Sequence, residues 1–312
     1  MALKLSSIKW KIMLWIVAAS ILLLGILTIF IYLQVSNSVH NMVYNNANAI
    51  TLGRAEQVGE LINVNLKAIE MAANSATVKT MDKDLIEQYL SQRRTVMGIG
   101  FETLYVVDMK GQARTAKGDD LDLSARDYVR QIYNGANFAI SNPIISGATG
   151  NPVFALAFPV KDDSGKLIGV LGGAITLVVA SQIAADSDLG GMGYGFITGG
   201  DGLMIAHPDE DYVMELNILQ ADREGFKGLS ELAKKITTGE TGHGQVKKPD
   251  GTSEMISFAP IPNTPNWALG IAVDVKEMDA DINQLLLFII VLVVVIALIY
   301  IAISYFLGNL IA

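Results

Sequence analysis

The stretch VSNSVHNMVYNNANAITLGRAEQVGELINVNLKAIEMAANS (residues 35–75) follows an uncharged apolar run, IMLWIVAASILLLGILTIFIYL (residues 12–33), and neither segment contains a proline. In residues 35–75, apolar residues recur at steps of three and four, with an interruption at Arg54: Val39, Val43, Ala47, Ile50, Val58, Ile62, Leu66 and Ile69. This spacing places them on one face of a helix. The sequence therefore predicts a single helix from about Ile12 to about Ser75, with an apolar stripe that packs against another surface.

Two segments of the chain are apolar enough to cross a bilayer, which takes about 20 apolar residues in a helix. One is residues 12–33 and the other is LLLFIIVLVVVIALIYIAISYFL (residues 285–307). Lysines and no acidic residue precede the first span, at positions 4, 9 and 11, and this bias places the N-terminus in the cytoplasm. A cleaved signal peptide is the alternative, but its apolar core has only about 7–15 residues. The longer run favours an uncleaved anchor.

We therefore predict a multi-pass protein of the inner (cytoplasmic) membrane with a large extracytoplasmic region. Its predicted parts are a cytoplasmic N-terminus (1–11), transmembrane helix 1 (12–33), the extracytoplasmic region (34–283), transmembrane helix 2 (285–307) and the start of a cytoplasmic connection (308–312). The extracytoplasmic region is predicted to contain a stalk helix (34–75), a membrane-distal unit (76–188) and a membrane-proximal unit (189–274).

Composition argues against several classes of function. The formal net charge of −8 disfavours binding to nucleic acid or to anionic lipid surfaces, and the absence of cysteine excludes disulfide and thiol chemistry. The three histidines are far apart in sequence and there is no Gly-x-Ser-x-Gly elbow. We therefore expect no catalytic centre, no metal site and no cofactor, and a structural hydrogen bond for His207. A membrane-anchored hydrolase and a scaffold protein are the alternatives.

The outer region shows strand and helix patterns that occur twice. The first set comprises a hairpin at 101–116 that turns at 109–111, a polar loop at 119–123, a helix capped by Ser124 and ending at Asn134, a hairpin turning at 162–165, and a helix near 179–186. The second set comprises strands within 193–213, a helix near 229–238, and strands at 242–247, 254–259 and 267–273. These patterns predict an α/β (α+β) fold with two related antiparallel-sheet units.

Four short stretches carry a resemblance to a known family: Ser124-Ala125-Arg126-Asp127-Tyr128, Thr149-Gly150-Asn151-Pro152-Val153, Gly165-Lys166-Leu167-Ile168-Gly169-Val170-Leu171-Gly172-Gly173, and Asp201-Gly202-Leu203-Met204-Ile205-Ala206-His207-Pro208-Asp209. In this order, between two apolar spans, the chain resembles the extracytoplasmic double Cache sensor domain of bacterial methyl-accepting chemotaxis receptors over roughly residues 35–283. The resemblance implies two stacked Cache (PAS-like) units on the long N-terminal helix, with a transmembrane helix on either side.

The resemblance also implies a ligand site in the membrane-distal unit. In family members that bind amino acids, an Arg-x-Trp-Tyr stretch holds the ligand carboxylate. Here Arg126 is retained, Tyr128 takes the Trp position and Val129 stands where the second aromatic would be. Leu121 and Ile144 stand at positions where tyrosines often occur.

In the same family members, two aspartates hold the ligand ammonium, and these positions correspond to Ser146 and Ala174 here. An ammonium group taken out of water without a carboxylate partner is strongly penalised. A small carboxylate is therefore the first expectation for the ligand, and an uncharged polar compound or heterocycle is the alternative.

The residues themselves support more than one interpretation. The guanidinium of Arg126 has five donors in a planar fork that suits a carboxylate, but an ion pair with Asp127 or Asp122 would also satisfy it. Tyr128 and Tyr105 are either pocket walls with hydroxyls or core aromatics, and the hydroxyl of Ser146 either bonds a ligand or caps a turn. The predicted ligand-binding residues are Arg126, Tyr128, Ser146, Tyr105 and Ala174.

These expectations describe the ligand-binding sensor region of a transmembrane chemoreceptor, not an enzyme. A small molecule bound in the distal unit would displace helices across the membrane. The exterior of a sensor histidine kinase or of a diguanylate cyclase is the alternative. The expected partners are the ligand, membrane lipid, a second copy in a homodimer, and a cytoplasmic signalling module with its kinase partners outside this chain; no nucleic acid is expected.

Overall fold

Two long helices lie at the two ends of the described chain. The computed structural model describes residues 8–93, 100–189 and 191–310. Helix α1 (Ile8–Ala73) is a single helix of 66 residues, which confirms the predicted long helix, and α7 (Val275–Leu310) is the last element. The chain divides into two compact units. One contains α1 as far as Asn45 together with α7, and the other is Asn46–Asp274.

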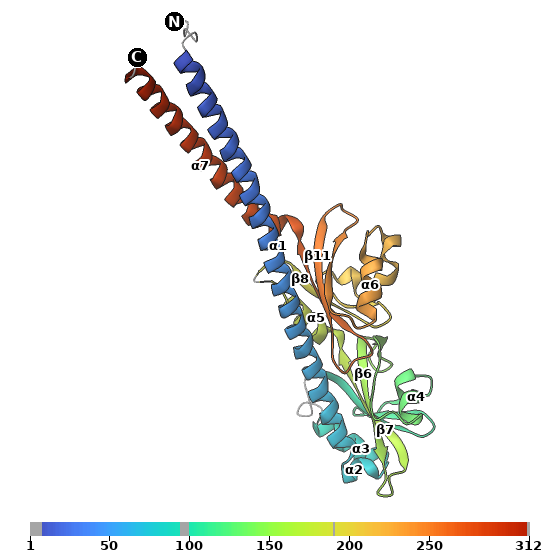
Figure 1. The fold of residues 1–312 in the computed structure, drawn as a ribbon. Helices are drawn as coiled ribbons and strands as arrows, with labels where there is room; N and C mark the ends of the chain where they lie inside the picture. Colours follow the sequence, from blue (N-terminus) through green and yellow to red (C-terminus); the bar gives the residue numbers. More distant parts are fainter. Residues whose placement is uncertain (1–7, 94–99, 190, 311–312) are drawn as a thin grey trace. The chain divides into compact units, whose positions relative to one another are not determined.

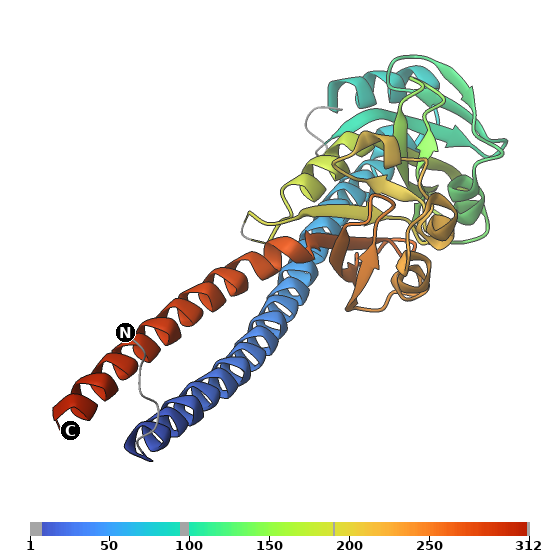
Figure 2. The same ribbon diagram turned by 90° about the horizontal axis from the view of Figure 1, so that it is seen from above.

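The unit that contains α7 presents an apolar surface. Both of its helices are long and apolar enough to cross a membrane, judged by length and composition. Large side chains on them stand exposed, among them Leu23 at 67%, Phe30 at 63% and Leu287 at 66%. Figures 1 and 2 show the two helices running beside each other, and Nε2 of His40 lies 2.9 Å from Oδ1 of Asp279 between them. So much exposed apolar surface is unfavourable in water and suits a lipid environment.

The first sheet of the other unit has seven strands in the order β3-β2-β1-β7-β6-β4, with β5 also paired to β6, all antiparallel. Its strands are β1 (Phe101–Asp108), β2 (Gln112–Thr115), β3 (Asp120–Asp122), β4 (Ala139–Ile140), β5 (Ile144–Ile145), β6 (Pro152–Lys161) and β7 (Leu167–Thr176). The associated helices are α2 (Ala76–Lys79), α3 (Lys83–Arg93), α4 (Asp127–Tyr133) and α5 (Leu177–Ala185).

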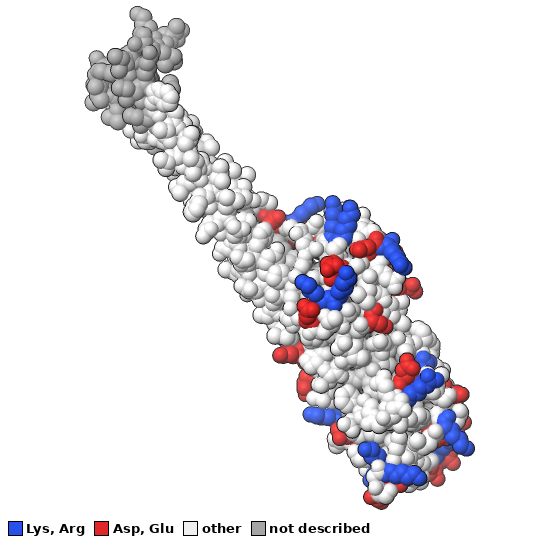
Figure 3. All heavy atoms as spheres, turned by 45° about the vertical axis from the view of Figure 1, so that its right-hand side comes forward, with Lys and Arg blue, Asp and Glu red and all other residues white. Residues whose placement is uncertain are grey.

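The second sheet has five antiparallel strands in the order β10-β11-β12-β8-β9. Its strands are β8 (Tyr194–Thr198), β9 (Met204–Ala206), β10 (Gly242–Lys247), β11 (Ser253–Pro260) and β12 (Ala268–Asp274). The 3₁₀ turns η1 (Glu210–Tyr212) and η2 (Ile218–Glu224) and helix α6 (Leu229–Thr237) complete this part. Figure 3 shows charged side chains spread over the surface of the unit that holds both sheets.

Helix α1 is held against these sheets by the stripe expected from the sequence. Val58 and Ile62 are 3% exposed and Ile69 is fully buried. Polar contacts add to this burial, because Thr51 Oγ1 donates to Ser257 Oγ on β11 at 3.2 Å. Ser257 in turn donates to Asn48 Oδ1 at 2.7 Å. The stripe from Val58 to Ile69 therefore finds its partner surface within the same chain, whereas Ile50, which was predicted on the same stripe, is 37% exposed.

Two local predictions are wrong. Residues 120–122 of the expected polar loop form strand β3, because their backbone pairs with β2 at the sheet edge. Ser124 does not cap the following helix: the N-cap is Arg126, which makes no side-chain capping bond. Ser124 instead accepts a hydrogen bond from Arg130 Nε through its carbonyl at 3.2 Å. The helix starts later because residues 124–126 form the turn that leads out of β3.

The two sheets meet at Trp267, which is 1% exposed. Its ring packs edge-on against Phe154 of β6, with 5.1 Å between the ring centroids. Its Nε1–H donates to Asn142 Oδ1 at 3.3 Å, and Asn142 Nδ2 donates to Asp201 Oδ2 at 3.4 Å. Asn142 lies between β4 and β5, so the strand edge of the first sheet is hydrogen-bonded to two segments of the second.

Candidate functional site

A pocket of about 320 Å³, counting the solvent at its mouth, opens on the first sheet. Strands β1, β6 and β7 form its floor, and the residues around the start of α4 and after β5 form its rim. All five predicted site residues line it: Tyr105, Arg126, Tyr128, Ser146 and Ala174. Strand order explains this grouping, because β1, β7 and β6 are neighbours in the sheet although they are far apart in sequence.

The floor of the pocket is made of small residues in register. Thr103 on β1 and Ala155 on β6 both pair with Ala174 on the strand between them. These three residues are between 1% and 4% exposed. Thr103 was missed in the sequence, although strand alternation puts it on the same face as Tyr105. The floor therefore offers one hydroxyl and no charge.

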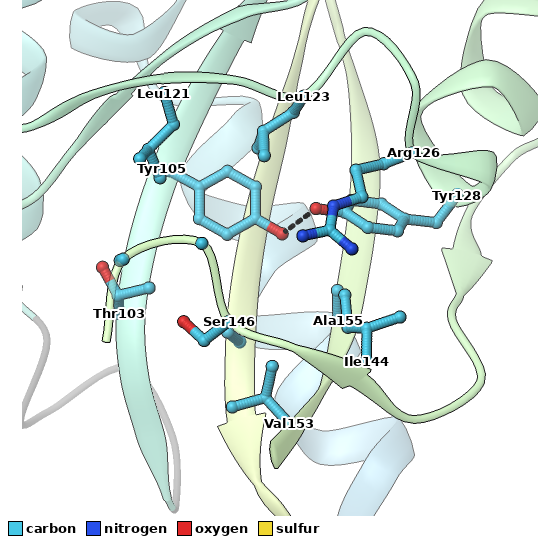
Figure 4. A pocket seen from close by; sticks show the side chains of 13 residues that line it. Thr103, Tyr105, Leu121, Leu123, Arg126, Tyr128, Ile144, Ser146, Val153 and Ala155 are labelled. Atoms are coloured by element: carbon cyan, nitrogen blue, oxygen red, sulfur yellow. Dashed lines mark hydrogen bonds between the residues drawn. The ribbon is translucent and has the colours of Figure 1, made fainter. Parts of the chain in front are cut away.

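Two buried tyrosines form one wall. Tyr105 and Tyr128 are each 3% exposed, and the hydroxyl of Tyr105 donates to that of Tyr128 at 3.0 Å (Figure 4). Burial raises the pKa of both hydroxyls, so both are neutral at physiological pH. Gly172 explains where Tyr105 lies, because a Cβ at that position would overlap the phenol ring.

Arg126 stands at the rim. It is half-buried, and Nη2 of its guanidinium donates to the carbonyl of Ile145 at 3.1 Å. The alternative role for Arg126, an ion pair with Asp127 or Asp122, is not among the salt bridges of the described residues. Figure 4 shows the guanidinium beside the ring of Tyr128, above the pocket floor. Because a single hydrogen bond uses only part of the fork, other donors of Arg126 remain for a ligand.

Ser146 is held by a short loop. Its backbone N–H donates to the carbonyl of Asn151 at 2.8 Å and its carbonyl accepts from the N–H of Gly150 at 2.9 Å. The side chain is 7% exposed and lines the pocket. The backbone of Ser146 therefore closes a turn, which leaves its side chain at the cavity, and a ligand-binding role stays a prediction.

The other positions that the resemblance singled out, Leu121, Val129 and Ile144, fall into two groups. Leu121 and Ile144 line the pocket as apolar wall. Val129 is fully buried in the core under α4 and does not line the pocket.

Next to the second sheet, just after β9, His207 Nδ1 accepts the backbone N–H of Asp209 at 2.9 Å, which confirms the structural hydrogen bond. Within the described residues, no three His, Asp or Glu side chains gather where they could hold a metal ion.

Comparison with known sequences identifies the family. The chain matches the Cache domain family over residues 33–282. It belongs to the Cache domain family. The α/β (α+β) fold of two sheet units on a long N-terminal helix, and the resemblance to double Cache sensors of chemotaxis receptors, are thereby confirmed.

Curated relatives of this Cache protein are chemotaxis receptors. It is 25% identical to the methyl-accepting chemotaxis protein McpG of Pseudomonas putida over 269 residues, covering 83% of this chain and 40% of McpG. It is 29% identical to the methyl-accepting chemotaxis protein PctB of Pseudomonas aeruginosa over 197 residues, covering 61% of this chain and 29% of PctB. The chain thus spans less than half the length of these relatives.

Solved structures share the Cache fold. The ligand-binding domain of the Pseudomonas fluorescens chemoreceptor CtaA, in complex with L-leucine, superimposes with a TM-score of 0.61 at 21% identity, covering 78% of this chain and 99% of that one. The ligand-binding domain of the Pseudomonas aeruginosa chemoreceptor PctC, in complex with GABA, gives a TM-score of 0.54 at 21% identity, covering 71% of this chain and 95% of that one.

Proposed function

We propose that this chain is the ligand-sensing, membrane-anchored part of a chemotaxis receptor, and that the pocket of the first sheet binds a small organic carboxylate. One observation carries the choice of ligand: among the described residues that line the pocket, Arg126 alone is charged. A lone guanidinium at the rim of an otherwise neutral cavity attracts an anion and can hold a carboxylate with two parallel hydrogen bonds.

The neutral floor is what argues against an amino acid. CtaA has been crystallised with L-leucine and PctC with GABA, and both compounds carry an ammonium group as well as a carboxylate. In this chain the positions that correspond to ammonium-binding aspartates are Ser146 and Ala174, which line the pocket without charge. Asp127 lines an adjoining hollow that shares Arg126 and Tyr128 with this pocket, and does not line the pocket itself. A buried ammonium would therefore lack a carboxylate partner.

A ligand screen on the full chain in detergent tests the proposal. Acetate, propionate, lactate and pyruvate are compared with L-alanine, GABA and uncharged nucleobases by thermal shift. A ligand that binds only the folded state raises the melting temperature, and the rise grows with the logarithm of its concentration relative to Kd. We expect at least one small carboxylate to stabilise the protein and the amino acids to have no effect. Stabilisation by amino acids alone would contradict the choice of ligand.

We also propose how binding reaches the second sheet. Ile144 lines the Arg126 pocket, and Asn142, two residues earlier, is hydrogen-bonded to Trp267 and Asp201. A ligand that draws Arg126 and the β5 segment together would pull on these bonds. A ligand changes the balance of two conformations only through different affinities for them. The segment from Asn142 to Ile144 would make different contacts in the two conformations, both with the ligand and with the second sheet.

Replacing Asn142 with alanine is expected to leave carboxylate affinity within about twofold, because Asn142 is outside the pocket. The same change should remove ligand-induced protection of β12 and β8 in hydrogen–deuterium exchange while preserving protection in β1, β6 and β7. Asn137→Ala, at an exposed position just before β4, is the matched control. Equal protection of the second sheet in the two variants would exclude this route.

The remaining parts of the proposal concern the membrane. The apolar surfaces of α1 and α7 support two spans, and we place the two sheets on the extracytoplasmic side of the inner membrane with the residue limits given above.

Exposed apolar residues on α1, such as Val64 at 46% and Met71 at 77%, are where we expect a second copy to pair. We propose sensing without catalysis because the curated relatives are chemotaxis receptors. The exterior of a sensor histidine kinase or of a diguanylate cyclase is the second candidate.

A further inference from the structure

A second hollow lies beside the second sheet. It measures about 400 Å³, counting the solvent at its mouth. Its walls are mostly apolar, formed by side chains such as Phe196, Leu216, Phe226 and Ile256. Polar groups are concentrated among Tyr194, His207, Lys248 and Glu254. Small-molecule sites have this composition, with an apolar body and a few convergent polar groups.

The central polar group is the carboxylate of Glu254, a residue only 5% exposed. It accepts hydrogen bonds from the hydroxyl of Tyr194, at 3.0 and 3.2 Å, and from Nζ of Lys248 at 3.0 Å. The side chain of Lys248 is 29% exposed, so its ammonium reaches the carboxylate on a flexible stem from the solvent side. A buried carboxylate must keep a cationic partner, but a ligand ammonium can serve as well as Lys248.

Tyr194, which donates to this carboxylate, belongs to a cluster of aromatic rings. The ring of His207 lies edge-on to Tyr194 at 5.0 Å and to Tyr212 at 4.9 Å between centroids. Burial lowers the pKa of His207, so the imidazole is neutral at physiological pH. Burial and the charge of Glu254 raise the pKa of Tyr194, so its phenol is neutral too. Neutral aromatic faces attract cations, and no ring here adds a positive charge.

An acidic groove adjoins the hollow and shares Tyr212, Leu216 and Phe226 with it. Its charged lining residues are all acidic: Asp211, Glu215 and Glu224. The ion pair of Lys248 and Glu254 leaves the hollow itself without net charge, so the groove determines the sign of the local field. A groove of one sign concentrates ions of the opposite sign, and here those are cations.

We propose that the hollow bounded by Tyr194, His207, Tyr212 and Glu254 is a second ligand site, which takes a small primary ammonium ion with a short apolar body. The ligand ammonium displaces Lys248 from Glu254 and keeps the hydrogen-bonded Tyr194 beside it, while the apolar body packs on Phe226 and Ile256. This site takes the class of ligand that the Arg126 pocket lacks the charges to hold. An anion fits poorly, because Lys248, the one cation among the described residues that line the hollow, is already paired with Glu254.

Calorimetric titration of the full chain in detergent with isobutylammonium chloride tests this site, with sodium isobutyrate as the anionic probe at matched ionic strength. We expect isobutylammonium to bind the unaltered protein. Lys248→Gln should bind it about tenfold more tightly, because the ligand no longer displaces a charge-assisted hydrogen bond. Glu254→Gln should bind it at least about tenfold more weakly, because the ammonium loses its carboxylate partner.

Lys234→Gln is the matched control, since Lys234 also lies 2.9 Å from a glutamate, Glu231, but in an exposed ion pair on α6. It should leave the affinity unchanged. If Glu254→Gln fails to fold, the tighter binding expected of Lys248→Gln and the unchanged binding expected of Lys234→Gln still decide the question. No binding of isobutylammonium, weaker binding by Lys248→Gln, or binding of isobutyrate that depends on Lys248 would each overturn the proposal. Amine binding that is lost in Arg126→Ala and kept in Glu254→Gln would place the amine in the first pocket instead.

Discussion

Replacing Arg126 with alanine is expected to weaken binding of a small carboxylate by at least about 100-fold. In the part of the chain that the structure describes, its guanidinium is the only charge that lines the pocket of the first sheet. A bidentate pair adds two charge-assisted hydrogen bonds, and a loss of about 2.7 kcal/mol corresponds to 100-fold in affinity. Arg126→Lys should recover only part of the affinity, because an ammonium cannot form the planar fork. Calorimetric titration of the full chain with the best carboxylate of the screen measures both effects.

Arg130→Ala is the matched control for this experiment. Arg130 lies one helical turn further along α4, is exposed, and donates to the carbonyl of Ser124 instead of lining the pocket. It should bind the carboxylate as the unaltered chain does. Ala174→Asp provides a complementary change, because it puts a negative charge on the neutral floor and should weaken carboxylate binding as well. Unchanged affinity in Arg126→Ala would show that the carboxylate binds elsewhere.

Replacing Gly193 with alanine is expected to lower the free energy of unfolding by about 3 kcal/mol or more. Gly193 has φ = +72°, and a Cβ there would overlap the carbonyl oxygen of Ala272 on β12. The neighbouring Tyr194 pairs with Ala272 in the sheet, so neither strand can move away without breaking the ladder. The substitution therefore adds backbone strain to a clash with main chain. Thermal unfolding followed by circular dichroism measures the loss.

Gly251→Ala separates the two causes. Gly251 also has a positive φ, +89°, but nothing lies within 4 Å of the Cβ position. Only backbone strain remains there, and this costs about 1–2 kcal/mol. A similar loss of stability in the two variants would mean that the contact with Ala272 contributes nothing. A loss in Gly193→Ala that clearly exceeds that in Gly251→Ala supports the close approach of β8 and β12.

Much of the fold could be predicted because it depends on patterns of residues that are close together in the sequence. Helix α1 follows from a proline-free stripe of apolar residues, and the hairpin of β6 and β7 follows from alternating apolar runs on either side of Asp162-Asp163-Ser164-Gly165. Strand β3 could not be predicted in this way. Its residues, Asp-Leu-Asp, are typical of a polar loop and become a strand only because β2 offers an unpaired edge. Long-range pairing overrode local preference at that position.

Some residues of the candidate site could likewise be predicted from the sequence, and others could not. Arg126, Tyr105 and Ala174 were predicted from a resemblance and from residue chemistry, and the sheet brings them to one pocket. Thr103 and Ala155 were missed, since a threonine or alanine in a strand carries no signal of its own. Their place beside Ala174 depends on the register of three strands that are far apart in sequence.

Periodicity and composition were sufficient for the two long apolar helices and the succession of strands, because each depends on neighbours within a few turns or residues of the chain. They say nothing of which side chains meet across distant segments. Asn142 and Trp267 are 125 residues apart, and Tyr194 and Glu254 are 60 apart. Such pairs are set by strand order and register, and so the hydrogen bonds between the sheets and the buried carboxylate of the second hollow became visible only in three dimensions.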